Sequence, residues 1–197
     1  MTKEEINKIK KADIMEKCYD CYAEYGLKEV GIKTLAQACG CTSGNLYTYF
    51  KDLDDLIIQS TAHCMSKVED DFMAKAPKTP DEVLRFIDEV PYWTAREHGK
   101  KYRLMYQIYT NPKYIEHGKK FFEGVNERYT EYAKFLENKI GMPYNITTAF
   151  IFILVRACVH YALFDDEYYL KTQISLLKKG VEYVLKKAVP DFDLNNI

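Results

Sequence analysis

Residues 42–49 gather side chains that could contact nucleic acid. Thr42 can cap the start of a helix, and Gly44 permits a phosphate to approach the exposed N–H groups of the first turn. Ser43 and Asn45 can then face base edges, since an Asn side chain can pair bidentately with adenine. Alternatively, Ser43 and Asn45 are ordinary solvated positions on a helix surface.

Two tyrosines follow these polar residues at alternate positions. A phenol has an apolar body that packs and an O–H that can donate to a phosphate. We expect Tyr47 to contact DNA and Tyr49 mainly to pack. The full predicted set of DNA-contacting residues is Lys33, Thr34, Thr42, Ser43, Gly44, Asn45, Tyr47, Thr48, Tyr49 and Lys51.

These side chains need two short helices that cross at a steep angle. The sequence predicts such helices over 32–39 and 43–50, with Gly40 at the turn and Ala36 at the crossing point. Their inward faces are formed by Leu35, Cys39, Cys41 and Leu46. The pattern is typical of a helix-turn-helix, whose second helix enters the DNA major groove by its N-terminal end.

Helix signals dominate the rest of the chain, and strand signals are scarce. Thr2 and Glu5 predict a capping box that opens a helix ending near Gly26, and Asp52 with Asp55 opens another that runs to about residue 74. After a break at 76–82, further helices are predicted around 80–97, 101–110, 113–139, 145–163 and 166–188. We therefore expect an all-α protein, with a three-helix DNA-binding domain over 1–52 and a larger helical ligand-binding and dimerisation domain over 53–197.

The last predicted helix carries apolar residues at alternating spacings of four and three, as in a heptad seam. Such a seam packs in a helical bundle, against a partner within the chain or across a dimer. The residues are Leu170, Ile174, Leu177, Val181, Val184 and Ala188.

Charge and hydropathy indicate in which cellular compartment the protein is expected. The net charge is -1, and the amphipathic N-terminus lacks the apolar core of a signal peptide, so we expect a cytoplasmic protein with reduced cysteines. The most apolar stretch, 146–164, contains Arg156 and His160 in its second half. We therefore interpret it as a buried or interface helix and expect no membrane partner.

The N-terminal motifs resemble the TetR family of transcriptional regulators. Over about residues 10–58, Tyr22 and Gly26 fit the family's first helix, 39–42 fit its Ala-Gly-Val-Ser segment, and 46–50 fit its Leu-Tyr-x-Tyr-Phe ending. The resemblance implies a homodimer formed by the last two helices, which binds a palindromic double-stranded DNA operator. It also implies that a small molecule entering the C-terminal domain releases the operator.

This sequence departs from the family pattern in its charge and in one cap. Val30 and Gly31 stand where the family commonly has a Thr or Ser that caps the second helix. Residues 1–60 contain eight lysines and ten acidic residues, although no acid falls between Val30 and Lys51. Few cationic contacts predict a shallow salt dependence of DNA binding.

A stripe of aromatic residues in the second half suits a pocket for a largely apolar or aromatic effector. For each residue, ordinary core packing is the alternative. Arg156, amid apolar neighbours, is expected to pair with a ligand carboxylate or with an acid such as Glu131 or Glu167. The predicted ligand-binding residues are Trp93, Tyr102, Met105, Tyr106, Tyr109, Phe122, Tyr129, Phe152, Arg156 and His160.

The remaining chemistry-bearing residues predict neither a metal site nor a catalytic site. Cys18 with Cys21 and Cys39 with Cys41 could form a metal or redox-sensing site, but they lack the spacing and context of zinc motifs, so we interpret them as small core residues. No HExxH, Gly-rich phosphate loop or Gly-x-Ser-x-Gly occurs, and no cofactor is predicted. The sequence favours a ligand-responsive repressor. The alternatives are a helical ligand-binding or interaction protein with degenerate DNA binding, or an enzyme that uses the C-terminal pocket.

Overall fold

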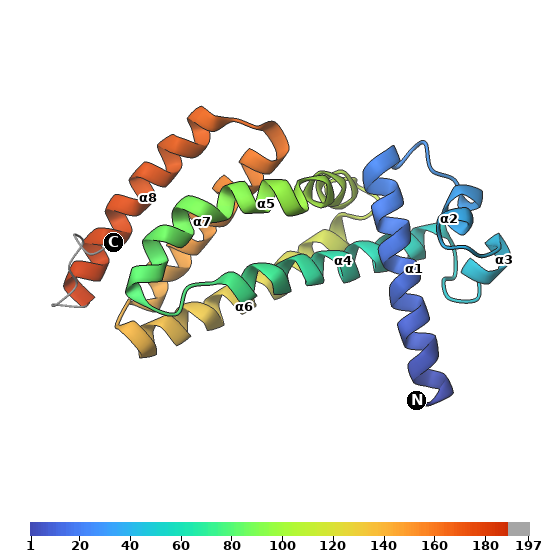
Figure 1. Ribbon diagram of the computed structural model, residues 1–197, viewed down its shortest axis with the longest axis horizontal. Helices are drawn as coiled ribbons and strands as arrows, with labels where there is room; N and C mark the ends of the chain where they lie inside the picture. The colour runs from blue at the N-terminus through green and yellow to red at the C-terminus, as the bar shows by residue number, and fades with distance from the viewer. Residues whose placement is uncertain (189–197) are drawn as a thin grey trace. The chain divides into compact units, whose positions relative to one another are not determined.

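The computed structural model describes residues 1–188, which form helices and no strand (Figure 1). This confirms the all-α prediction. The helices are α1 (Lys3–Tyr25), α2 (Ile32–Ala38), α3 (Ser43–Leu46), α4 (Leu53–Lys75), α5 (Pro80–Tyr109), α6 (Ile115–Ile140), α7 (Tyr144–Phe164) and α8 (Glu167–Ala188).

The chain divides into two compact units. Unit 1 comprises Met1–Asp70 and Lys100–Phe121, and unit 2 comprises Asp71–Gly99 and the chain from Phe122 onward. Unit 1 thus extends beyond the three N-terminal helices, because it includes most of α4 and the turn between α5 and α6. A division by packing does not locate a division of roles, so the functional boundary after residue 52 stays a prediction.

Helix α1 begins and ends as predicted. The Thr2 hydroxyl accepts a hydrogen bond from the Glu5 N–H at 3.2 Å, and the Glu5 carboxylate accepts one from the Thr2 N–H at 2.7 Å. Two of the orphan donors at the helix start are satisfied in this way. Gly26, with φ of +93°, ends the helix, because this backbone conformation is strained for other residues.

Helices α2 and α3 form the predicted helix-turn-helix beside α1 (Figure 1). Gly40 turns the chain with φ of +65°, and Leu35, Ala36 and Leu46 are buried between the helices. Helix α3 is shorter than the predicted 43–50. After Leu46 the chain tightens into turns, in which N–H groups bond to carbonyls three residues earlier, as Thr48 N–H does to the Asn45 oxygen at 3.2 Å.

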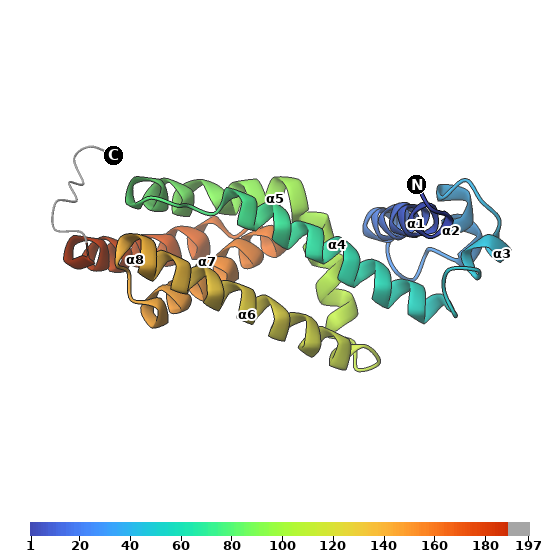
Figure 2. The same ribbon diagram turned by 90° about the horizontal axis from the view of Figure 1, so that it is seen from below.

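In unit 2, α7 and α8 form an antiparallel hairpin that can be followed in Figures 1 and 2. Asp165 ends α7 in the left-handed region, with φ of 55°, and its N–H donates to the Tyr161 oxygen at 2.8 Å. The Asp166 carboxylate then accepts from the Tyr169 N–H at 2.9 Å and opens α8. This leaves a two-residue connection between the helices.

The heptad seam of α8 packs within the chain. Leu170, Leu177 and Val181 are buried, and Ile174 and Val184 pack against the same core. That core also contains Phe72 and Val83, Leu84, Ile87 and Val90 of α5, Tyr129 of α6, and Leu154 and Cys158 of α7. The partner of the seam is therefore the rest of unit 2.

Helix α5 is continuous, although the sequence predicted a break at Gly99. Gly99 is buried, and a Cβ added there would lie 3.6 Å from the Ala162 carbonyl oxygen. The helix continues through this buried glycine, so the predicted break was wrong. Pro91 also lies within the helix.

Helix α7 is long and apolar enough to cross a membrane by length and composition alone. A third of its most apolar window is buried, on a face that includes Leu154, Ala157 and Cys158. Core helices of soluble proteins pass the same test, so this finding is weak evidence for a span.

Candidate DNA-binding surface and effector cavities

The start of α3 is built as a capped, exposed helix terminus. The Thr42 hydroxyl accepts a hydrogen bond from the Asn45 N–H at 3.3 Å, which satisfies one of the orphan donors. The Thr48 hydroxyl donates to the Asn45 carbonyl oxygen at 2.6 Å and holds the turn that follows. Leu46 and Phe50 are almost wholly buried and anchor the segment to the body of unit 1.

The predicted DNA-contacting residues lie on α2 and on the segment 42–51 that follows it. Ser43 and Tyr49 are half-buried, whereas the side chain of Tyr47 is 51% exposed. This agrees with the expected division between a tyrosine that reaches outward and one that packs. The exposed members of the set are Lys33, Thr34, Thr42, Gly44, Asn45, Tyr47, Thr48 and Lys51. Contact with DNA stays a prediction for each of them.

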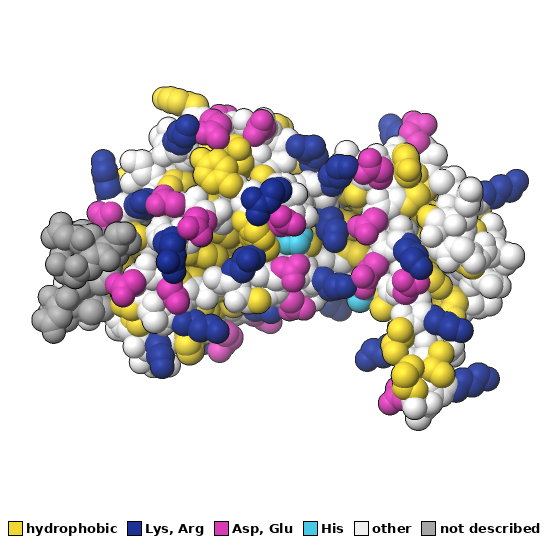
Figure 3. Space-filling view, viewed as in Figure 1, with side chains coloured by type: hydrophobic (Ala, Val, Ile, Leu, Met, Phe, Trp, Pro, Cys, Tyr) yellow, Lys and Arg dark blue, Asp and Glu magenta, His cyan; other side chains and the backbone are white. Residues whose placement is uncertain are grey.

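Few charged side chains lie on this surface (Figure 3), and the start of α2 has no side-chain cap. Gly31 precedes α2 without a side-chain cap, as the sequence predicted. The part of the surface over α2 and α3 carries few charged side chains in Figure 3. Asp55 accepts a hydrogen bond from the Gln59 amide at 2.6 Å and one from the Lys51 N–H at 2.9 Å, and these bonds lower the pKa of its carboxyl group.

A hydrogen-bond cluster fixes the start of α4 to the turn before α6, within unit 1. The Asp54 carboxylate accepts from Lys113 Nζ at 2.7 Å and from the Tyr114 hydroxyl at 2.6 Å. The ion pair with Lys113 and the bond from Tyr114 lower the pKa of Asp54. Sequence reasoning missed this cluster, because Lys113 and Tyr114 lie 59 and 60 positions after Asp54 in the chain.

The predicted effector residues are distributed between the two units. Tyr102, Met105 and Tyr109 are buried in unit 1, and Tyr106 is half-buried there. Tyr109 packs against Phe121, with ring centroids 5.5 Å apart. The other six, which lie in unit 2, are Trp93, Phe122, Tyr129, Phe152, Arg156 and His160. The structure does not bring the ten together in one cavity.

Arg156 differs from its predicted environment. The apolar sequence around it suggested a buried guanidinium, but α7 directs Leu154, Ala157 and Cys158 inward and leaves Phe152 and Arg156 exposed. A helix that is apolar all around does not reveal from sequence which face is buried. His160 is half-buried, with Nε2 3.4 Å from the Asp166 carboxylate.

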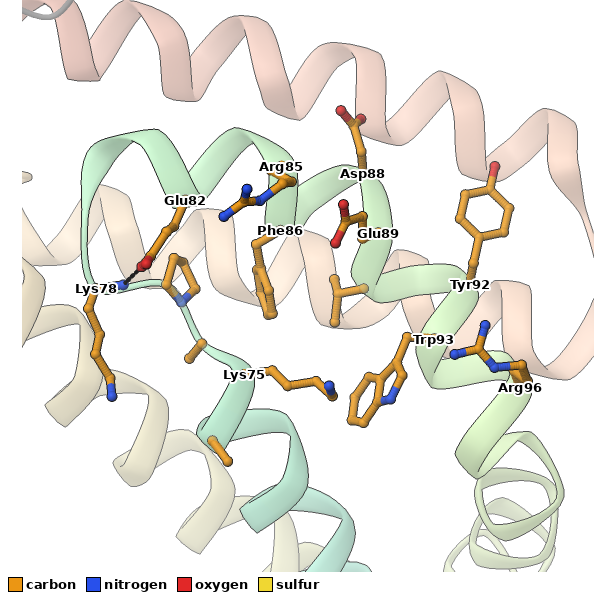
Figure 4. Close-up of a pocket in the computed structure, with 14 residues that line it drawn as sticks. Lys75, Lys78, Glu82, Arg85, Phe86, Asp88, Glu89, Tyr92, Trp93 and Arg96 are labelled. Carbon is orange, nitrogen blue, oxygen red and sulfur yellow. Dashed lines mark hydrogen bonds between the residues drawn. The ribbon is translucent and has the colours of Figure 1, made fainter. Parts of the chain in front are cut away.

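An open groove of about 750 Å³ lies in unit 2, along the end of α4 and the first half of α5 (Figure 4). Figure 4 shows Lys75, Phe86 and Trp93 directed toward one another on one side of the groove, and Lys75 Nζ lies 4.9 Å from the Trp93 ring centroid. Four cations line the groove, Lys75, Lys78, Arg85 and Arg96, together with the acids Glu82, Asp88 and Glu89.

Two of these acids are held by protein partners. Glu82 accepts hydrogen bonds from the backbone N–H groups of Lys78 and Thr79, at 2.7 and 3.3 Å, which lower its pKa. Asp88 pairs with Lys178 of α8 at 2.6 Å. Lys178 therefore offsets the charge of Asp88, whereas the backbone bonds favour the ionised form of Glu82.

A small apolar cavity of about 60 Å³ lies inside unit 2 and shares Ala76, Pro77 and Phe86 with the groove. Tyr129 and Leu154 are among its other lining residues. Of the predicted effector residues, Trp93 lines the groove and Tyr129 lines the cavity. Residues 75–96 carry four cations and four acids, so charge in the sequence does not indicate the groove.

Comparison with known proteins gives a likeness of structure. No family model and no curated protein sequence matches the chain. Solved TetR regulators from Haloarcula marismortui and Mesorhizobium loti are 16% and 15% identical. Their TM-scores are 0.68 and 0.69, and the matches cover 90% and 95% of this chain and 98% of theirs.

A third solved structure is a transcriptional regulator FadR from Bacillus subtilis in complex with stearoyl-CoA. It is 18% identical, with a TM-score of 0.53 and coverage of 88% of this chain and 96% of that one. All three likenesses extend over both compact units and not only over the helix-turn-helix. The chain therefore has the fold of TetR-type transcriptional regulators.

Proposed function

We propose that the protein is a ligand-responsive DNA-binding transcriptional regulator, a cytoplasmic repressor that binds a palindromic operator as a homodimer. The observation that carries the proposal is the exposed, Thr42-capped start of α3, anchored from behind by Leu46 and Phe50. A helix N-terminus with free N–H groups favours a phosphate, and polar side chains beside it reach base edges.

Within this surface the residues have different roles. Asn45 reads a base edge, Tyr47 donates its hydroxyl to a phosphate, and Lys33 and Lys51 supply the cationic contacts. With two lysines on each protomer, a dimer neutralises about four phosphates, and the slope of log affinity against log salt is about -3.6. This slope is shallow compared with that of more basic regulators.

DNA fragments from the region upstream of the protein's own gene, titrated at two salt concentrations, test the proposal. We expect sequence-specific binding with the shallow slope. Asn45→Ala should reduce discrimination between sites, and Tyr47→Phe should weaken all sites to a similar degree. Lys139→Ala, at an exposed position on α6, is the matched control and should change neither. Binding that is absent, or insensitive to both Asn45→Ala and Tyr47→Phe, would contradict the proposal.

The effector is an amphipathic anion whose charged end binds in the groove and whose apolar part enters the small cavity behind Phe86. The groove supplies cations and the indole of Trp93, and the cavity supplies an apolar wall. Because the cavity is far smaller than ligand pockets of about 300–1,000 Å³, a bound chain must displace side chains. The Bacillus subtilis FadR structure holds a ligand of this chemical class, stearoyl-CoA.

Trp93 is the sole tryptophan of the chain, so its fluorescence reports on the groove directly. We would titrate the protein with coenzyme A thioesters of increasing chain length, with free fatty acids and with coenzyme A alone. Comparison of these affinities distinguishes the contribution of the ligand's charged end from that of its apolar chain. Arg85→Ala should weaken binding of every charged compound, whereas Phe86→Ala should extend the accepted chain length. Lys134→Ala, on α6 outside the groove, is the control. Equal responses to Arg85→Ala and Lys134→Ala would contradict this site.

The homodimer uses the outer face of the α7–α8 hairpin. Large apolar side chains are exposed there in the single chain, which is typical of interaction surfaces. They are Ile146, Phe152, Ile153 and Phe164 on α7 and Tyr168, Leu176 and Tyr183 on α8. Two recognition segments held about 34–36 Å apart can occupy successive major grooves. A ligand that favours another spacing weakens operator binding by its differential affinity, typically about 1–3 kcal/mol.

A further inference from the structure

Two cysteines of unit 1 lie close together where α1 packs beside α2. Cys18 lies on α1 and Cys39 directly follows α2, and their Sγ atoms are 3.5 Å apart. A disulfide has an S–S length of about 2.05 Å, so the two sulfur atoms need to approach by about 1.5 Å. Rotation of the side chains with a small backbone shift provides a movement of this size.

The two thiols differ in access and in acidity. Cys18 is fully buried, whereas Cys39 is half-buried and so open to a small reagent. The pKa of Cys39 is lowered by its hydrogen bond with Cys18 and by nearby Lys17, although burial and Asp13 oppose the shift. The pKa of Cys18 is raised by the same bond and by burial. Cys39 is therefore the attacking thiol of the pair and Cys18 the resolving one.

The other four cysteines lack this combination. Burial raises the pKa values of Cys21, Cys41, Cys64 and Cys158. Metal binding is not an alternative in the described residues, because no three His, Cys, Asp or Glu side chains are grouped to hold an ion. Among the cysteines, Cys18 and Cys39 are the pair that combines close sulfur atoms with a lowered pKa, that of Cys39.

We propose that Cys39 and Cys18 form an oxidation site for small hydroperoxides, which convert the pair into a disulfide. The Cys39 thiolate attacks the peroxide and is oxidised to a sulfenic acid, while the peroxide O–O bond breaks and releases hydroxide or alkoxide. The Cys18 sulfur then attacks the Cys39 sulfur, the S–S bond forms, and the sulfenic oxygen leaves with a proton as water. A low-molecular-weight thiol reduces the Cys18–Cys39 disulfide by exchange and restores both cysteine thiols, while the added thiol is itself oxidised to a disulfide.

The disulfide would act on the turn that places α3. Cys39 immediately precedes Gly40, whose positive φ sets the direction of the chain into Thr42 and α3. Drawing Cys39 toward α1 shifts this turn relative to the anchor formed by Leu46. We therefore expect oxidation to lower the affinity for DNA. This second readout rests on the proposed function, whereas formation of the disulfide can be measured without it.

The test is oxidation of the full-length protein with hydrogen peroxide, followed by thiol counting and peptide mapping without reduction. We expect the count to fall from six thiols to four, with Cys18 and Cys39 in one linked pair that dithiothreitol releases. Cys18→Ala should instead accumulate a sulfenic acid at Cys39 that dimedone traps. Cys39→Ser should keep its five thiols at the same peroxide dose.

Cys41→Ser is the matched control, since it removes a neighbouring thiol and should leave the linked pair intact. Circular dichroism of each variant shows whether it is folded before oxidation. A disulfide that involves Cys21 or Cys41, or six intact thiols at a peroxide dose that oxidises a low-pKa reference protein, would overturn the proposal. If the linked pair forms but DNA binding is absent in both redox states, the proposed function fails and the oxidation site stands.

Discussion

Two glycines of α6 test how closely this helix packs. Gly118 lies in unit 1 against Tyr109, and Gly124 is the control position in unit 2. A Cβ added at Gly118 would lie 2.8 Å from Tyr109 Cβ and 3.1 Å from the Tyr109 carbonyl oxygen. Those atoms belong to the backbone or lie next to it, so they cannot rotate away. At Gly124 nothing lies within 4 Å of the added Cβ.

The two Gly→Ala substitutions should therefore have opposite effects on the free energy of unfolding. In a helix interior, Ala is more favourable than Gly by about 1 kcal/mol, and Gly124→Ala should gain this amount. At Gly118 the same gain is opposed by an overpacking cost of about 1–3 kcal/mol. We expect Gly118→Ala to be less stable than Gly124→Ala by about 1–3 kcal/mol, and itself neutral to destabilised by about 2 kcal/mol.

Urea denaturation followed by far-ultraviolet circular dichroism measures both changes, and thermal midpoints should shift by about 2–4 °C per kcal/mol. The two glycines lie in different compact units, so separate transitions, if resolved, should move separately. The reasoning is refuted if Gly118→Ala is stabilised as much as Gly124→Ala, because the close approach of Tyr109 would then have no energetic effect.

Three further outcomes follow from local contacts. Thr42→Ala should destabilise unit 1 by about 0.5–2 kcal/mol and weaken DNA binding, and Thr42→Ser should restore both, as measured by urea midpoints and DNA titration. Lys113 and Tyr114 lower the pKa of Asp54, so the stabilisation is fully present above the unfolded-state pKa of about 3.9 and is lost as pH falls through the lower folded-state pKa. Thermal midpoints of wild type and Asp54→Asn should therefore differ near neutral pH and converge only below that folded-state pKa. Leu176→Glu should weaken the dimer in sedimentation experiments at least tenfold, whereas Phe135→Glu, at an exposed apolar position of α6, should not; equal effects would argue against the α7–α8 interface.

Sequence reasoning succeeded where the interactions are local. The Thr2 and Glu5 capping box and the turn at Gly40 depend on residues a few positions apart, and both appear as predicted. The predicted break at Gly99 was wrong because a glycine that ends a helix and one within a helix look the same in sequence.

The effector site was less predictable because aromatic spacing does not indicate what a face contacts. Tyr102, Met105 and Tyr109 have the periodicity of a pocket wall, yet they are buried in unit 1. The groove itself depends on cations from α4 and α5 that converge only in the folded chain, such as Lys75 and Arg85. Which acids are already paired, as Asp88 is with Lys178, is likewise a property of the tertiary structure.

The shortness of α3 has a consequence for how this protein can change during evolution. Between Thr42 and Lys51, Leu46 and Phe50 are fully buried, and the hydroxyls of Thr42 and Thr48 hold the backbone, so the fold of this segment depends little on the exposed side chains of Asn45 and Tyr47. Substitutions at Asn45 and Tyr47 can therefore alter the exposed surface while the anchors keep the segment in place. If the proposed function holds, a lineage carrying this fold could acquire new DNA-binding preferences by single substitutions that leave the protein folded.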